Sequence, residues 1–311
     1  MTKPPQSEEE GALPGRAAAV LGAELQSPLA PALYLVATPI GNLADITLRA
    51  LAVLARADLV FCEDTRHSRK LFSHFGIKRE LAPYHEHNAA RERPRILARL
   101  RAGFSVALVA DAGTPLVSDP GFKLARAARE EGLEVIAIPG PAAPIAALTS
   151  SGLPSDRFFF EGFLPAKREA RRKRIEALAD IPASLVLFEA ANRVEATLAD
   201  LAAVLGERQG AVAKELTKRH ERVVTAPLGT LAKAIAAWPE EARKGEFVIV
   251  VAPPARREAS RAEIEERLAA ALKGASVRDA ARAVAAELGA PRGQVYKIAI
   301  ELSGGGEGKG A

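Results

Sequence analysis

Two short polar segments in the N-terminal half carry the side chains best suited to acid–base chemistry. The first is Glu63-Asp64-Thr65-Arg66-His67, and the second is His85-Glu86-His87-Asn88. A His-x-His pair beside carboxylates could bind zinc, but we find no cysteine partner and no His-x-x-x-His pair on a helix. We therefore expect no metal, and we interpret both segments as polar groups that bind a substrate and order a cleft.

Three apolar runs that end in loops rich in proline and glycine indicate where a ligand would bind. They cover residues 33–37, 106–110 and 135–138. Short unbroken apolar runs are typical of strands buried on both faces, so we expect one parallel sheet whose carboxyl edge gathers the three loops. Open α/β sheets bind ligands at this edge. The loops carry few charges, which favours a cofactor cleft over three ordinary turns.

The loops do not match the common phosphate-binding motifs. Residues 111–121 contain no lysine and do not match a Walker loop, and no loop has the glycine spacing of a Rossmann fingerprint. NAD and ATP are therefore disfavoured. Because glycine lets the backbone approach a ligand and proline fixes the loop shape, we expect a ligand held by backbone groups and small apolar side chains. Asp119, followed by Pro120, is predicted to cap the next helix.

Composition favours a cytoplasmic enzyme. The chain has 311 residues, of which 48% are hydrophobic and 26% charged, enough for two cored domains with appendages. No apolar stretch approaches the length of a membrane span, and the first thirty residues lack the order of a signal peptide. The single cysteine, Cys62, cannot form an internal disulfide, which agrees with a reducing compartment, and we interpret it as a core residue.

The order of apolar runs and breakers predicts an α/β fold with two lobes, a cofactor cleft between the lobes, and a small helical domain at the C-terminus. Four strands are expected in the second lobe, at residues 158–160, 185–188, 211–213 and 247–251. The predicted parts are a disordered tail over 1–30, lobes over 31–139 and 140–254, a helical domain over 255–303, and a disordered tail over 304–311.

A cluster of positive charge suggests a polyanionic partner. Lysine plus arginine exceeds aspartate plus glutamate by 43 − 38 = 5, and six cations fall within eight residues. We predict that this run contacts nucleic acid, the alternative being a solvated helix surface. The six cations are Lys167, Arg168, Arg171, Arg172, Lys173 and Arg174.

Together, the motifs resemble those of a known family. They are residues 38–47, 63–67, 85–88, 111–121, 139–141, 152–158, 161–165, 215–218 and 244–246. Over about residues 31–302 the chain is similar to the tetrapyrrole methylase superfamily, and within it to the subfamily that methylates small-subunit ribosomal RNA.

This resemblance implies a two-lobed methyltransferase, usually a homodimer, that binds S-adenosylmethionine between its lobes. The implied reaction is 2′-O-methylation of a cytidine in the decoding region of 16S rRNA within the small ribosomal subunit. Tetrapyrrole-modifying members carry Gly-Pro-Gly-Asp where this chain has Pro39-Ile40-Gly41-Asn42, which argues against a porphyrin substrate. The alternatives are another methyltransferase of the superfamily, acting on a tetrapyrrole or a protein, and a non-catalytic RNA-binding assembly factor.

The polar segments 63–67 and 85–88 both follow expected strands of the first lobe, so we expect their side chains to meet at the mouth of the cleft. Asp64 or His87 would accept the proton of a ribose hydroxyl, Arg66 would hold the flanking phosphate, and Lys214 is an alternative cation near the nascent alkoxide. The competing interpretation is that the segment 63–66 pairs internally and caps the next helix. The implied cofactor-binding residues are Pro39, Ile40, Gly113, Thr114, Val117, Ala142, Ala143, Phe188 and Glu246.

Overall fold

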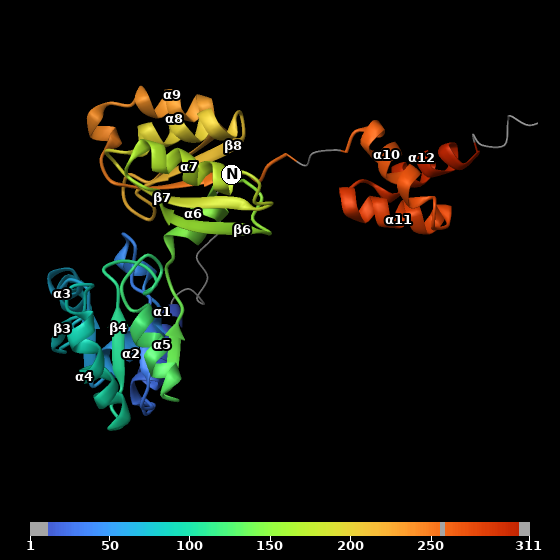
Figure 1. The fold of residues 1–311 in the computed structure, drawn as a ribbon. Coiled ribbons are helices and arrows are strands. Elements are labelled where there is room, and N and C mark those ends of the chain that lie inside the picture. The colour runs from blue at the N-terminus through green and yellow to red at the C-terminus, as the bar shows by residue number, and fades with distance from the viewer. Residues whose placement is uncertain (1–11, 256–258, 305–311) are drawn as a thin grey trace, which may run out of the picture. The chain divides into compact units, whose positions relative to one another are not determined.

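The computed structural model describes residues 12–255 and 259–304 of the chain (Figure 1). The chain divides after Pro254 into two compact units, residues 1–254 and 255–311. The first unit contains two five-stranded sheets, and the described part of the second is helical. Within the described ranges, no helix combines the length and apolar character that a membrane span requires.

The first sheet confirms the predicted parallel arrangement. Its strand order is β3-β2-β4-β1-β5, and every pairing is parallel. Leu33 of β1 aligns with Val106 of β4 and with Val135 of β5, so the loops that follow these strands leave the same edge. The strands are β1 (Leu33–Val36), β2 (Leu59–Cys62), β3 (Leu81–Pro83), β4 (Val106–Val109) and β5 (Val135–Ile138).

Helices cover both faces of this sheet because successive strand residues point to opposite sides. Tyr34 and Val36 pack into one core with α2 and α3, whereas Leu33 packs into the other core with α4 and α5. Cys62 is buried in the first of these cores, as expected. The helices are α2 (Leu48–Arg56), α3 (Thr65–His74), α4 (Ala89–Arg101) and α5 (Phe122–Glu130), with a short 3-10 turn, η2 (Leu43–Asp45), before α2.

The second sheet is mixed, with order β6-β7-β10-β8-β9. Only β6 and β7 run parallel, and the other pairs are antiparallel. The four predicted strands are present, but β9 was missed because its sequence, RVVTAP, lacks a buried apolar run. The strands are β6 (Phe158–Phe163), β7 (Ser184–Ala190), β8 (Gln209–Lys214), β9 (Arg222–Pro227) and β10 (Glu246–Val251).

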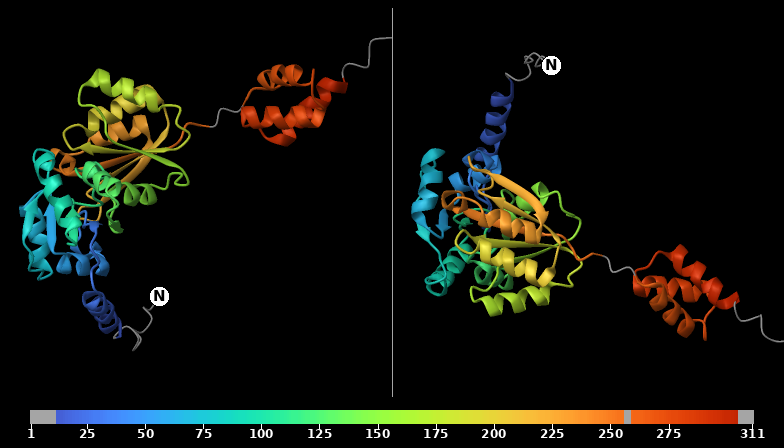
Figure 2. Two further views of the ribbon diagram at one scale, coloured as in Figure 1. Left: turned by 60° about the horizontal axis from the view of Figure 1, so that its bottom comes forward. Right: turned by 90° about the horizontal axis from the view of Figure 1, so that it is seen from above.

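Three helices cover one face of the second sheet, and α6 covers the other (Figures 1 and 2). On the α6 side, Ile40 from the first lobe joins the same apolar cluster as Val186 and Val248. The two lobes therefore share a core. The helices are α6 (Ala143–Ser150), α7 (Arg168–Leu178), α8 (Val194–Leu205) and α9 (Leu228–Ala236), and a 3-10 turn, η3 (Glu240–Arg243), precedes β10.

The prediction of disorder over residues 1–30 is wrong where the structure describes that segment. Helix α1 (Leu13–Gln26) is rich in alanine and leucine, which favour helix, and the Arg56 guanidinium of α2 donates to its Glu24 carbonyl at 3.0 Å. Residues 1–11 and 305–311 of the predicted tails lie outside the described residues. Gly304, predicted as the first residue of the C-terminal tail, is instead the last residue of a helix.

Three helices with their own apolar core form the described part of the second unit. They are α10 (Arg261–Ala271), α11 (Val277–Leu288) and α12 (Arg292–Gly304). Ser260 and Ser276 cap the first two through their side chains, and Gly289 ends α11 in the left-handed conformation that glycine favours. Ile264, Leu268 and Val284 lie in the core.

Candidate active site

Hydrogen bonds join the three loops at the carboxyl edge of the first sheet. The Thr38 and Gly113 backbones exchange two hydrogen bonds of 2.9 Å, and the Thr38 hydroxyl donates to the Ala110 carbonyl at 3.2 Å. The Thr114 hydroxyl donates to the Pro141 carbonyl, also at 3.2 Å. Because each loop is fixed by a neighbour, the edge presents one ordered surface rather than three independent turns.

Two glycines make this close contact possible. Gly113 has φ +79°, a conformation that residues with a side chain rarely adopt. A Cβ on Gly140 would lie 3.0 Å from the Cβ of Ala37, tighter than ordinary contact. Both positions require glycine for the loops to meet as they do.

A cavity of about 640 Å³ lies between these loops and the second sheet. This volume falls within the range of about 300–1,000 Å³ that is usual for small-ligand sites. Of the nine residues that the resemblance implied for cofactor binding, Pro39 alone does not line it. The other eight do: Ile40, Gly113, Thr114, Val117, Ala142, Ala143, Phe188 and Glu246.

The sequence predicted one ring of the aromatic wall of this cavity, Phe188, but not the others. Phe160 and Phe163 of β6 lie beside Phe188 of β7, with ring centroids 5.0 and 5.5 Å from it. Phe158 also lines the cavity. The run Phe158-Phe159-Phe160 predicted a strand, and only the sheet pairing reveals which rings face the cavity. Aromatic rings of this kind can hold a flat heterocycle by stacking.

The charged side chains that line the cavity are all acidic. They are Asp119, Glu189 and Glu246. The Glu189 carboxylate already has partners within the protein, because Arg193 lies 3.1 Å from it and the Thr197 hydroxyl donates to it at 2.6 Å. Glu246 pairs at 2.9 Å with Lys218, which the described lining does not include. Asp119 has no cationic partner among the described residues, so the cavity suits a cation rather than a phosphate.

Asp119 does not cap α5 as predicted. Gly121, at φ +134°, occupies the N-cap position, and the Asp119 carboxyl is hydrogen-bonded to the Glu63 carboxyl. Burial, followed by the neighbouring charges of Glu63 and Asp111, raises the pKa of Asp119 to about 6. Burial likewise raises the pKa of Glu63. Asp119, which lines the cavity, is therefore paired with a second acid whose pKa is also raised.

The geometry of the segment 63–66 agrees with the interpretation that it pairs internally and caps the next helix. The Asp64 carboxylate accepts from the Arg66 backbone N–H at 2.8 Å, which makes it the N-cap of α3. It also accepts three further hydrogen bonds from the Arg66 guanidinium, the shortest at 2.6 Å. These hydrogen bonds hold the pKa of Asp64 well below its usual range. Asp64 is thus a weak proton acceptor as it stands.

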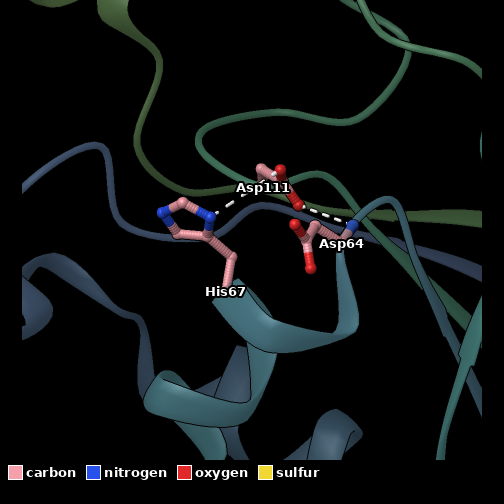
Figure 3. Close-up of side chains that lie close together, drawn as sticks. All are labelled: Asp64, His67 and Asp111. Atoms are coloured by element: carbon pink, nitrogen blue, oxygen red, sulfur yellow. Dashed lines mark hydrogen bonds and ion pairs between the residues drawn. The ribbon is translucent and has the colours of Figure 1, made fainter.

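Asp64 also belongs to a group of two carboxylates and one imidazole (Figure 3). Asp64, His67 and Asp111 have one ligand atom each within 4.8 Å of the others. The Asp111 carboxylate accepts from the Asp64 backbone N–H at 2.9 Å, and His67 Nδ1 lies 4.0 Å from it. Such a group could ligate a cation, but Asp111 and Asp64 already accept hydrogen bonds that order the loops, so we assign no metal to it.

The remaining predicted catalytic residues lie in different environments. His87 is exposed, with its ring 6.0 Å from that of His85. Lys214 is buried at the end of β8. Among the described residues that line the cavity, none is Asp64, Arg66, His87 or Lys214. A second contact between the lobes lies near Lys214, where the Asn42 backbone N–H donates to the Thr217 hydroxyl at 3.1 Å.

Most of the basic run lies in α7, and two of its cations are paired with acids. Arg171 is only 5% exposed, and its guanidinium donates to the buried Asp200 at 2.8 Å. Arg174 forms a pair of hydrogen bonds with Glu161, the shorter at 2.6 Å. The prediction that Arg171 contacts nucleic acid is therefore wrong, because the acids that balance the run come from distant parts of the sequence.

The other four cations of the run differ in their contacts. Arg168 lies 3.3 Å from Asp200, although its side chain is largely exposed. Lys167, Arg172 and Lys173 form no ion pair with a described side chain, and Lys173 is exposed. The surface that α7 offers to an anion is thus formed chiefly by Lys167, Arg168, Arg172 and Lys173.

Both units of the chain match models of known protein families. Residues 32–232 match the model of the Tetrapyrrole (Corrin/Porphyrin) Methylases, and residues 258–303 match the RsmI C-terminal HTH domain. Among solved structures, uroporphyrin-III-C-methyltransferase from Thermus thermophilus is similar, with a TM-score of 0.51 and 25% identity over 71% of this chain and 94% of that one. Diphthine synthase shares the fold, with a TM-score of 0.55 and 19% identity over 71% and 89% of the two chains.

Sequence relatives are considerably closer than these structures. The ribosomal RNA small subunit methyltransferase I of Mesorhizobium japonicum is 49% identical over 285 residues, covering 91% of this chain and 96% of the relative. That of Escherichia coli O157:H7 is 46% identical over 283 residues, covering 88% and 96%. The chain therefore belongs to the tetrapyrrole methylases and, within them, to the ribosomal RNA small subunit methyltransferase I family.

Proposed function

We propose that this chain methylates the 2′-hydroxyl of a cytidine in the decoding region of 16S rRNA, with S-adenosylmethionine as methyl donor and the small ribosomal subunit as substrate. The observation that carries the proposal is the acidic, partly aromatic cavity between lobes that belong to this family. We further propose that the protein acts in the cytoplasm and as a homodimer, as the family resemblance implies.

The cavity fits the proposed cofactor in both charge and shape. When bound, S-adenosylmethionine supplies a methyl group activated by a positively charged sulfur. Phe160, Phe163 and Phe188 offer an apolar wall for the adenine. Asp119 would offer a carboxylate to a cationic group of the cofactor, and backbone carbonyls of the Gly113 loop would meet positive charge without an ion pair.

The chain's main contribution to the reaction is positioning. Methyl transfer to an oxygen needs the attacking oxygen, the methyl carbon and the sulfur in line, so fixed cleft walls supply much of the rate. A proton acceptor near the ribose would assist, because a 2′-hydroxyl is weakly acidic. We keep Asp64, His87, Arg66 and Lys214 as candidates for the acid–base and charge-stabilising roles, with His87 favoured over Asp64 because its imidazole has no ion-pair partner among the described residues.

Incubation of the purified protein with labelled S-adenosylmethionine and small subunits from a strain lacking the modification tests the function. We expect label in 16S rRNA, recovered after nuclease digestion as 2′-O-methylcytidine. Protein-free 16S rRNA serves as a parallel substrate. Cofactor binding without any label in RNA would contradict the proposal, and RNA binding without cofactor binding would favour an assembly factor.

Single substitutions can separate acid–base roles from structural ones. His87→Ala should lower turnover about a hundredfold or more without changing affinity for S-adenosylhomocysteine, since a general base contributes roughly that much. His74→Ala, at the exposed C-terminal end of α3, is the matched control. Asp64→Asn keeps a helix cap but cannot accept a proton, so full turnover in this variant would leave Asp64 with a capping role alone.

The half-buried Asp119 carboxyl predicts a pH dependence of cofactor binding. Because its pKa is raised to about 6, Asp119 is mostly protonated at pH 5 and charged at pH 7.5, and only the charged form attracts a cation. Affinity for S-adenosylhomocysteine, measured by calorimetry, should therefore fall up to about tenfold per unit as pH drops below 6. Asp119→Asn should bind weakly and lose this dependence. Equal wild-type affinity at pH 5 and 7.5, with the fold intact by circular dichroism, would contradict the assignment.

The surface of α7 predicts which cations bind RNA. Arg172→Glu combined with Lys173→Glu should weaken binding to 16S rRNA and reduce the slope of log affinity against log salt. Lys70→Glu combined with Lys78→Glu, two exposed lysines of the first lobe, makes the same change in charge as a control. Arg171 is left unchanged, because its loss would cost about 3–5 kcal/mol by leaving Asp200 buried with a weaker partner. If both double variants changed RNA affinity and salt slope equally, the basic run would be solvated surface without a specific role in RNA binding.

A further inference from the structure

Helix α12 of the second unit has one face in the core and one that the unit leaves uncovered. Val295, Ile298 and Ala299 are buried against α10 and α11. On the opposite side of the helix, Tyr296 is 44% exposed and Lys297 is exposed. Arg292 stands one turn before Tyr296, so the three side chains lie along the outer side of the helix.

Two of the cations that form no ion pair within the described part of the unit lie on this face. Three arginines are each held by acids of the unit at 2.6–3.3 Å, whereas Arg292 and Lys297 form no ion pair or hydrogen bond with a described side chain. Lys273 and Arg278, outside α12, are unpaired in the same sense. The paired arginines are Arg261, Arg267 and Arg282, and their partners are Glu265, Glu301, Glu287 and Asp279.

A glycine on the same face has no role in the fold. A Cβ on Gly293 would meet nothing within 4 Å, so packing does not require glycine there. Alanine is the better helix former, so helix propensity does not favour glycine at this position, the second residue of α12. Between Arg292 and Lys297 it leaves the helix backbone open to close approach.

The connection between α11 and α12 has the form of a helix–turn–helix. Helix α11 ends at Leu288, Gly289 takes φ +62°, and α12 begins at Arg292. In this motif the second helix is the one that faces nucleic acid. Helix α12 is thus the element of the unit from which such contacts are expected.

We propose that Arg292, Tyr296 and Lys297, on the outer face of α12, bind the phosphate backbone and an unstacked base of the substrate RNA. Two unpaired cations complement phosphates, and an exposed tyrosine can stack on a base and donate its hydroxyl. The open backbone at Gly293 lets the RNA approach closely. This inference rests on the proposed function and assigns the second unit to substrate recognition rather than to catalysis.

Binding of the full chain to protein-free 16S rRNA over a series of salt concentrations tests the proposal. Arg292→Ala combined with Lys297→Ala should weaken binding about tenfold near physiological salt and lower the salt slope by about 1–2, since two phosphate contacts are lost. The control, Arg267→Ala combined with Arg282→Ala, removes the same charge from paired positions and should change affinity less than twofold. Equal affinity and slope in both double variants would overturn the proposal.

Two further readouts separate recognition from folding. Gly293→Ala should keep or raise the unfolding temperature of the full chain while weakening RNA binding, a combination that a structural role would not give. In methylation of small subunits, the α12 double variant should raise KM about tenfold and leave kcat and S-adenosylhomocysteine affinity unchanged. An unchanged KM would overturn the inference.

The controls also distinguish this inference from the function on which it rests. If the wild-type chain fails to methylate RNA, the proposed function fails. If wild type methylates and the α12 variant does so with the same KM, only the inference fails. Weakened binding to intact subunits with unchanged binding to protein-free RNA would identify a ribosomal protein as the partner and overturn the assignment to RNA.

Discussion

The packing of Ile40 is the contact on which the rest of the cleft depends. This side chain leaves a loop of the first lobe and enters the apolar cluster of the second sheet, beside Val186 and Val248. A Cβ built on Gly113 would lie 3.4 Å from Ile40, so the loop after β4 also lies against this side chain. Because protein interiors are closely packed, one residue placed in both lobes fixes the distance between the cavity walls. A cleft used to align three atoms in a line needs walls fixed in this way.

The net charge of the cleft depends on which of its acidic side chains form ion pairs with cationic ones. Arg193 neutralises Glu189, and Lys218 neutralises Glu246 at its exposed end. Asp119 instead meets a second acid, Glu63, and the pKa values of both carboxyl groups are raised. Without a bound cation, no positive side chain among the described residues that line the cavity offsets the repulsion between these carboxylates. A cationic ligand would relieve it, which gives the site a preference for charge independent of any shape complementarity.

Sequence reasoning succeeded where the signal was local and failed where the partner was distant. The loops after β1, β4 and β5 were found because each carries its own glycines and prolines, and parallel pairing then brings them together. Asp119 was misplaced as a cap because local rules favour Asp before Pro, whereas Glu63 lies more than fifty residues away. Arg171 was counted as surface for the same reason, since Asp200 is not visible from the run itself. Where a side chain's partner lies far along the chain, spacing within one segment cannot reveal it.

The position of β10 in the second sheet has a consequence for synthesis of the chain. This strand is the last of the sheet in sequence, yet it lies between β7 and β8. The first sheet is complete once residue 138 has left the ribosome, whereas β7 and β8 have no partner at their facing edges until Glu246–Val251 emerges. Unpaired edges invite contact with other chains, so the nascent second lobe passes through an aggregation-prone stage. The final strand also supplies Phe247 and Val248 to the cavity, so cofactor binding can begin only after the sheet has closed.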